Sequence, residues 1–567
     1  MTGARTSLEA GATAPWRRAP VVILLIVLLL VLAVWRLVAT AAHDSTRQYF
    51  GRTSAPASNV LRFANGAEPE TLDPGHMSGQ PDGRIARAIF EGLLVPHPQT
   101  LAPVAGVAEH WELGDDGVTY TFHLRHDVVW TNADPVTAHD FAWSWLRVLD
   151  PDTPARYSDL FYMIRGAQRF KAGERVDVGI HALDDHTLQV VLEAPTPYFI
   201  ELVMFYPFLP VHRATVEAHG ERWTHYKNIV TNGPFRLVHH RQNDRFVMEK
   251  SASYWDAENV RLDGIIAYSM DDLTTMMNMY RAGLTDWNPS GYLPAEFVPY
   301  VQDYEDYRAG SFLGSYYYSI SVTKPPFDDI RVRRALAYAI DREQITKFVL
   351  HESVTPWGRF VPDGFSTYPY PEAVTFDPQR AQRLLADAGY PGGAGFPPME
   401  ILFNTSEDHK KIAEAIQAMW KQHLGIEVAL ANQEWASYLR ATRALDYQVA
   451  RRSWIGDYLD PNTFLACLKT GDGNNRTGWS SARYDSLLGA ASRERDAARR
   501  MQLLADAEAI VLDEMPYLPI YSYRTREFVA PYVRGWYPTM LDTHPLKSIW
   551  FDRDTRGAAQ ASGGVGL

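Results

Sequence analysis

A regular alternation of strand and helix patterns in the second half of the chain constrains the fold more than any other feature. The apolar periodicity predicts a strand at 399–404, a helix at about 408–424, a strand at 426–432, a helix at about 435–443 and a strand at 447–451. Strands separated by helices of this length pair in parallel, because the chain has to cross back over the sheet. The pattern therefore predicts an α/β fold whose ligand site lies beyond the carboxyl ends of the strands.

Three groups of side chains follow these strands at that edge. His409 begins a helix, Trp435 begins the next one, and the stretch RRSWIGD contains Arg451 and Asp457. The arginine is a permanent cation that suits a carboxylate, and the aspartate is an anion that suits an ammonium group. A short peptide carries both groups. The alternative is an ordinary structural ion pair between Arg451 and Asp457, which is the commoner arrangement.

Catalysis is the other possibility for these carboxylates. Asp457 and Asp460 could form the pair that glycoside hydrolysis requires, although sequence does not give their separation. The chain has no G-x-S-x-G, H-E-x-x-H, Walker-type or G-x-G-x-x-G motif. Its 18 histidines are scattered, and the adjacent His239 and His240 would point to opposite faces of a strand. We therefore expect a binding protein, not an enzyme, with no metal and no cofactor.

The N-terminus carries an export signal. Arg17 and Arg18 precede an apolar run from Ala19 to Trp35, so the first residues should stay in the cytoplasm and the body should be exported. Residues 1–41 are then a cytoplasmic stub with either an anchor helix at 19–38 or a signal peptide cleaved near Ala41. Either outcome places the body on the periplasmic side of the inner membrane.

Composition excludes some functions. The 567 residues carry a formal net charge of −12 without a long basic block, so a nucleic-acid surface is not expected. Cys467 is the only cysteine, which rules out an intrachain disulfide and predicts a small core residue. Residues 42–58 are polar and predict a linker, and residues 555–567 predict a disordered tail.

Nine stretches carry a resemblance to a known family. They are EPETLDP (68–74), AIFEGLL (88–94), GVAEHWELGDDGVTYTFHLR (106–125), PVTAHDFAWSWLRVLDPDTP (135–154), IVTNGPF (229–235), KPPFDDIRVRRALAYAIDRE (324–343), NTSEDHKKIA (404–413), NQEWASYL (432–439) and VARRSWIGDYLDP (449–461). On these stretches the chain resembles the family 5 extracellular solute-binding proteins, and within them the oligopeptide-binding receptors of ABC importers. The resemblance covers about residues 59–551.

The resemblance implies a two-lobed, class II periplasmic-binding-protein-like α/β fold with an additional third domain, here preceded by the N-terminal apolar helix. Two crossing strands near 311–322 and 520–529 would form the hinge between the lobes. The implied divisions are a discontinuous lobe I (59–90, 217–313 and 525–554), an extra domain II (91–216) and lobe III (314–524).

It also implies a site and partners. The receptors hold an extended peptide by main-chain hydrogen bonds and hand it to the membrane subunits of an ABC importer. By matched motif, Asp457 resembles the group that takes the peptide ammonium, and Arg451 and His409 resemble the groups that meet its carboxylate. The aromatic positions that match the lining of the site are Trp435, Trp454, Tyr157, Tyr317 and Tyr523. A monomer is expected.

Two positions depart from the family pattern. Ser78, followed by Gln80, stands where these receptors often carry an acidic residue near the ammonium end. Ala337 stands where a lysine can occur. Peptide length, and a cell-wall peptide as ligand, therefore stay open. The same scaffold could also bind a metal chelate, a sugar or an opine, and the competing enzyme class is a membrane-anchored hydrolase.

Overall fold

The computed structural model describes residues 49–77, 79–270, 272–291 and 293–553. The apolar run at 19–38, the cleavage site near Ala41 and the tail at 555–567 lie outside these residues. Among the residues described, no helix combines the length and the apolar character that a membrane span requires.

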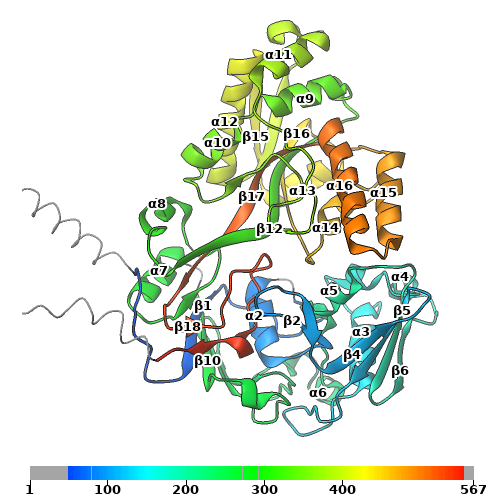
Figure 1. The fold of residues 1–567 in the computed structure, drawn as a ribbon, viewed down its shortest axis with the longest axis vertical. Helices are drawn as coiled ribbons and strands as arrows, with labels where there is room; N and C mark the ends of the chain where they lie inside the picture. Colours follow the sequence, from blue (N-terminus) through cyan, green and yellow to red (C-terminus); the bar gives the residue numbers. More distant parts are fainter. Residues whose placement is uncertain (1–48, 78, 271, 292, 554–567) are drawn as a thin grey trace, which may run out of the picture.

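A mixed sheet of 11 strands runs through both large lobes (Figure 1). Its order is β15-β14-β16-β12-β17-β11-β1-β10-β9-β8, with β13 beside β17. The strands are β1 (Val60–Gly66), β8 (Phe235–Arg241), β9 (Arg245–Lys250), β10 (Gly264–Ser269), β11 (Trp287–Asn288), β12 (Tyr307–Ile320), β13 (Thr355–Pro356), β14 (Met399–Asn404), β15 (Val428–Gln433), β16 (Val449–Ile455) and β17 (Tyr517–Val529).

The long antiparallel strands β12 and β17 connect the two lobes. They pair from Tyr307 opposite Phe528 in lobe I to Ser319 opposite Tyr517 in lobe III. These are the strands in which the hinge is predicted. Their pairing slips midway, so that residues 312–314 of β12 lie opposite Tyr523 alone. Such a bulge bends a strand and interrupts its ladder of hydrogen bonds.

The alternation predicted for residues 399–457 is confirmed. Strand β14 pairs in parallel with both β15 and β16, and helices α12 (Glu407–Leu424) and α13 (Trp435–Arg443) cross between them. Strand β16 differs from the prediction, because it continues to Ile455. The whole strand pairs with β12, from Val449 opposite Ile320 to Ile455 opposite Gly314. Local periodicity could not reveal a partner so far away in the sequence. Arg451 therefore lies within the strand and not after it.

Lobe III stands above the rest of the molecule in Figure 1. Helix α9 begins at the cap Asp329, and α11 begins at the cap Asp377 with Pro378 in its first turn. The helices of this lobe, besides α12 and α13, are α9 (Ile330–Tyr338), α10 (Arg342–Gln344), the π-helical turn Ile345–Val349, α11 (Pro378–Asp387), α14 (Asn462–Leu465), α15 (Ala482–Arg493) and α16 (Ala497–Glu514).

Domain II contains a separate antiparallel sheet of order β4-β5-β7-β6. Residues 119–124 alternate between the two faces of this sheet, and Tyr120, Phe122 and Leu124 are buried. The elements of this domain are β4 (Ala108–Leu113), β5 (Thr119–Leu124), β6 (Ile180–Asp184), β7 (Thr187–Val191), α3 (Ala138–Leu149), α4 (Ala167–Lys171), α5 (Phe199–Val203) and α6 (Arg213–His219).

Domain II and lobe I share one continuous hydrophobic core. A single cluster includes Phe63 of β1 and Trp287 of β11 as well as Phe122 of β5 and Trp145 of α3. The core of lobe III is built of separate clusters, and Cys467 is buried there. Lobe I and domain II are thus packed as one body.

The remaining elements are α2 (Gln80–Ile89), α7 (Leu273–Arg281), α8 (Val298–Val301) and the two-stranded pairs β2 (Leu94–Pro96) with β3 (Pro103–Ala105) and β18 (Val533–Arg534) with β19 (Trp550–Phe551).

Candidate functional site

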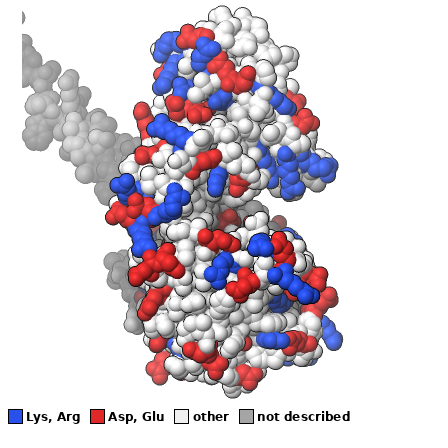
Figure 2. All heavy atoms as spheres, turned by 90° about the vertical axis from the view of Figure 1, so that its right-hand side faces the viewer, with Lys and Arg blue, Asp and Glu red and all other residues white. Residues whose placement is uncertain are grey.

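Asp457 lines a cavity in which all three parts of the chain meet. The cavity has a volume of about 210 Å³; Gln80 of lobe I, Tyr157 and Tyr206 of domain II, and Asp457 of lobe III lie in its wall. A smaller adjoining cavity contains Asp457 together with Glu201. Figure 2 shows an indentation of the surface between the upper lobe and the body below it. The loop that follows β16 therefore presents a carboxylate to a space between the lobes.

The Asp457 carboxylate is half-buried and unpaired. No Lys, Arg or His nitrogen of the described residues lies within 4.0 Å of it, whereas its backbone N–H donates to Thr463 Oγ1 at 3.2 Å. Burial, and to a lesser extent the negative charge of Asp159, together raise its pKa to about 6. Asp159 belongs to domain II, so this repulsion acts between domain II and lobe III. An ammonium group between them would relieve that repulsion.

Asp460, three residues further on, has a different role. Both of its oxygens accept hydrogen bonds from Arg500 of α16, at 2.5 and 3.0 Å, and both side chains are buried. The pair fixes the loop that carries Asp457. Because Asp460 is already neutralised, Asp457 and Asp460 do not form the free carboxylate pair that the glycosidase alternative requires.

Arg451 is a buried cation with only neutral neighbours. Its guanidinium donates to Asn404 Oδ1 at 3.4 Å, Ser453 Oγ at 3.2 Å and Tyr523 OH at 3.4 Å, and it lies 4.6 Å from the ring centroid of Tyr316. No carboxylate of the described residues is within 4.0 Å, so the alternative of an Arg451–Asp457 ion pair is wrong. A buried cation without an anion is costly, which makes this position ready to accept one.

His409 lies beside Arg451. Its Nδ1 is 3.2 Å from Tyr316 OH, the residue whose ring the guanidinium covers. Burial, and to a lesser extent the positive charge of Arg451, together lower the pKa of His409 to about 3. The imidazole is therefore neutral at physiological pH. The structure brings Arg451, His409 and Tyr523 together as one cationic group, which we call the β16 cation cluster.

The other predicted residues are placed as follows. Tyr157 and Gln80 line the cavity with Asp457, and Gln80 Nε2 donates to the carbonyl of Leu541 at 3.5 Å. Trp454 is half-buried, and its indole N–H has no partner among the described residues. Ser78 and the side chain of Trp435 lie outside the described residues. Their roles stay predictions.

Tyr317 requires a correction. It is 0% exposed and packs between Phe360 and Tyr517 in a core of lobe III, so it does not line the cavity in this structure. Successive residues of a strand point to opposite faces, and it is Tyr316 that shares a face with Arg451 and His409. Three tyrosines follow one another at 316–318, and their sequence does not indicate which of them shares that face.

Two charged residues of the cavities were not predicted from sequence. Arg87 of α2 lines both cavities; its guanidinium lies 5.5 Å from the ring centroid of Tyr206, and it forms no ion pair with a described residue. Glu201 of α5 lines the smaller cavity, and burial raises its pKa to about 7. Both residues lie in ordinary amphipathic helices, so only the packing of domain II against lobe I reveals them.

Comparison with known proteins assigns the family. Residues 102–476 match the profile of bacterial extracellular solute-binding proteins, family 5. The chain is 33% identical over 521 residues to the oligopeptide-binding protein OppA of Bacillus subtilis (89% of this chain, 94% of that protein). It is 35% identical over 527 residues to the periplasmic OppA of Salmonella typhimurium (91% and 95%).

Solved structures of similar proteins include an unliganded open form and a peptide complex. The unliganded open form of the periplasmic murein tripeptide-binding protein MppA superimposes with a TM-score of 0.79 at 32% identity, covering 88% of this chain and 98% of that one. Haemophilus influenzae OppA in complex with RPPGFSPFR gives 0.70 at the same identity, covering 88% and 99%. The lobes described here are therefore arranged more as in the open form. The chain belongs to the family 5 bacterial extracellular solute-binding proteins.

Proposed function

We propose that this protein is an extracytoplasmic receptor that captures short peptides between its lobes and delivers them to an ABC importer. The observation that carries the proposal is a strand with a free charge of each sign. Arg451 lies within β16 and Asp457 lies just beyond its end, and neither has an ion-pair partner among the described residues. The names of the relatives, which are oligopeptide-binding proteins, support the same ligand class.

The spacing of the two charges suits an extended chain. Six residues of extended strand span about 20 Å, and a bound peptide advances by about 3.3 Å per residue. A peptide of a few residues can therefore place its ammonium at Asp457 and its carboxylate at the β16 cation cluster. Its main chain would be held by protein main-chain groups, which do not discriminate between side chains.

Closure would follow from bending at the bulge between β12 and β17. This is the hinge closure expected of a two-lobed, class II binding protein. Domain II would move together with lobe I, because the two share a hydrophobic core. In the closed form the peptide neutralises Asp457 and Arg451 at the moment when both lose water. We further propose a monomer without a cofactor that returns peptides intact, held at the periplasmic side of the inner membrane by residues 19–38 or released there by cleavage near Ala41.

A cell-wall peptide is a second candidate. Arg87 is an additional cation at the ammonium end, which suits a ligand with more than one carboxylate. A periplasmic murein peptide-binding protein of Escherichia coli is 35% identical over 484 residues. Competition between a plain peptide and a murein tripeptide would decide between the two.

The direct test is the identification of bound ligand by mass spectrometry after denaturing the purified protein, followed by calorimetry with peptides. Plain peptides should bind, whereas N-acetylated and C-amidated versions should bind more weakly. Recovery of a sugar or a metal chelate, or shortening of the added peptide, would overturn the proposal in favour of another solute or of a hydrolase.

Peptide affinity is expected to fall as the pH drops below about 6. Only the ionised carboxylate attracts an ammonium group, and the pKa of Asp457 is raised to about 6. Affinity should be level above that pH and fall up to about tenfold per pH unit below it, because binding then has to release a proton. His409, with a pKa of about 3, stays neutral over this range and does not contribute.

The same titration has a matched control. Asp159→Asn removes the charge that raises the pKa of Asp457, so the onset of the fall should move to lower pH. Dissociation constants from calorimetry between about pH 5 and 8 give both curves. An affinity that does not change across this interval would contradict the assignment of Asp457.

Arg451→Met should weaken peptides that reach the β16 cation cluster by about 1.5–3 kcal/mol, the range for a hydrogen bond to a charged group. Methionine keeps the apolar stem over the Tyr316 ring, so packing changes little. Calorimetry with a series of peptide lengths, each also as its C-terminal amide, measures the effect. Equal losses for every length and for the amides would count against a carboxylate contact.

A further inference from the structure

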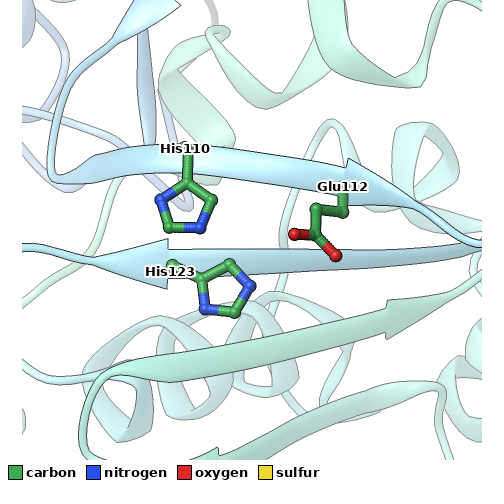
Figure 3. A group of neighbouring side chains, drawn as sticks. All are labelled: His110, Glu112 and His123. Carbon is green, nitrogen blue, oxygen red and sulfur yellow. The ribbon is translucent and has the colours of Figure 1, made fainter.

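The solvent-facing side of the domain II sheet carries three metal-binding side chains (Figure 3). His110 of β4 is paired directly with His123 of β5, and Glu112 follows two residues after His110 on the same face. The opposite face of β5 carries Phe122 and Tyr120, which pack into the core. The three side chains therefore project away from the core that surrounds the peptide cavity.

The donor atoms of this group are close together and not otherwise engaged. One ligand atom of each residue lies within 4.8 Å of the other two. Among the described residues, Glu112 forms no ion pair and His123 no hydrogen bond. The one carboxylate of these residues within 4.0 Å of a His110 nitrogen is that of Glu109, 3.8 Å from Nδ1. No cationic side chain in the described part of the chain neutralises the Glu112 carboxylate, so it is free to bind a metal ion.

The sheet supplies the spacing that chelation needs. Residues directly opposite on antiparallel strands have Cβ atoms about 4.5–5.5 Å apart. The two imidazole rings are stacked with centroids 4.2 Å apart and an angle of 11° between their planes. Rotation of the rings about their side-chain torsions would turn one nitrogen of each towards the Glu112 carboxylate, which lies beside them in Figure 3.

We infer that His110, Glu112 and His123 form a surface site for a divalent transition-metal ion, with Zn²⁺ as the best fit. Two imidazoles and one carboxylate are borderline ligands that suit Zn²⁺ and not the oxygen-preferring Mg²⁺ or Ca²⁺. Three protein ligands leave the fourth tetrahedral position to water. Because β4 is the edge strand of its sheet, the ion would tie that edge to β5.

The test is a calorimetric titration of the purified full chain with ZnCl₂ at about pH 7.5, where imidazoles bind metal in the neutral form. One equivalent should bind to the wild type and raise the melting temperature. His110→Ala and His123→Ala should each weaken this binding at least about tenfold, the lower bound expected when a ligand is lost. Glu112→Gln should also weaken it, and MgCl₂ should give no heat.

His139→Ala is the matched control, because this histidine is exposed on α3 in the same domain and pairs only with Asp185 among the residues described. It should bind Zn²⁺ as the wild type does. All variants should bind peptide as the wild type does, which separates this site from the proposed function. Zinc affinity unchanged in both His110→Ala and His123→Ala, or no zinc binding by the wild type, would overturn the inference.

Discussion

Asp457→Asn should weaken peptide binding by about 2–5 kcal/mol, the loss found when one member of a buried charge pair is removed. This corresponds to a roughly 30- to 5,000-fold higher dissociation constant. The asparagine keeps the size of the side chain, so the cavity shared with Tyr157 and Gln80 is preserved. What is lost is the negative charge, and the peptide ammonium would then be buried without an anion beside it.

Calorimetry with one peptide and its N-acetylated form isolates this effect. The wild type should discriminate strongly against the acetylated peptide, and Asp457→Asn should discriminate little, because the interaction is already absent. Asp446→Asn is the control, since Asp446 lies in the same lobe with its side chain 85% exposed. If Asp457→Asn binds as the wild type does, or if it still discriminates against acetylation, the ammonium lies elsewhere.

Arg500→Met should lower the free energy of unfolding of lobe III by about 3–5 kcal/mol, because it leaves the buried carboxylate of Asp460 without its partner. The side chains of this pair are only 7% and 8% exposed, so water cannot replace the arginine. Peptide affinity should fall as well. The loop that ends β16 would lose its attachment to α16, and Asp457 would no longer be held in position.

Urea unfolding monitored by fluorescence measures the loss as a lower midpoint at an unchanged slope. Arg483→Met is the control, because Arg483 is exposed on α15 and should change stability by less than about 0.5 kcal/mol. Replacing both members by leucine should recover most of the lost stability, because no unpaired charge stays buried. If Arg500→Met unfolds at the wild-type urea concentration, the pair does not anchor the loop.

The elements that the sequence predicted well are those with local determinants. Periodicity is contained within one helix or strand, so β14 lies between two parallel partners and α12 and α13 cross between the strands, as the alternation predicts. The residue at which β16 ends has no such local determinant. Its last residues extend because β12 pairs with them, and β12 is far away in the chain.

In the candidate site, too, some properties follow from residue type and others only from tertiary packing. Residue type identified Arg451 and Asp457 as charges that could bind a zwitterionic chain, and the structure adds that neither is neutralised by a described residue. Sequence left Asp457 and Asp460 open as a carboxylate pair, and it chose Tyr317 where the structure places Tyr316 beside Arg451. Each choice depends on a partner in another element: Arg500 for Asp460, and the opposite face of β12 for Tyr317.

The sequence by itself determined the α/β alternation and the resemblance to the family to which the chain belongs, and it proposed the strand edge for the ligand groups. These follow from short-range patterns that do not depend on the rest of the fold. Only the tertiary structure decided which charges are free, because a charge is neutralised or left open by neighbours brought from distant segments. It also placed Arg87 and Glu201 in the cavities and His110 opposite His123, since contacts between strands and between domains have no local signal.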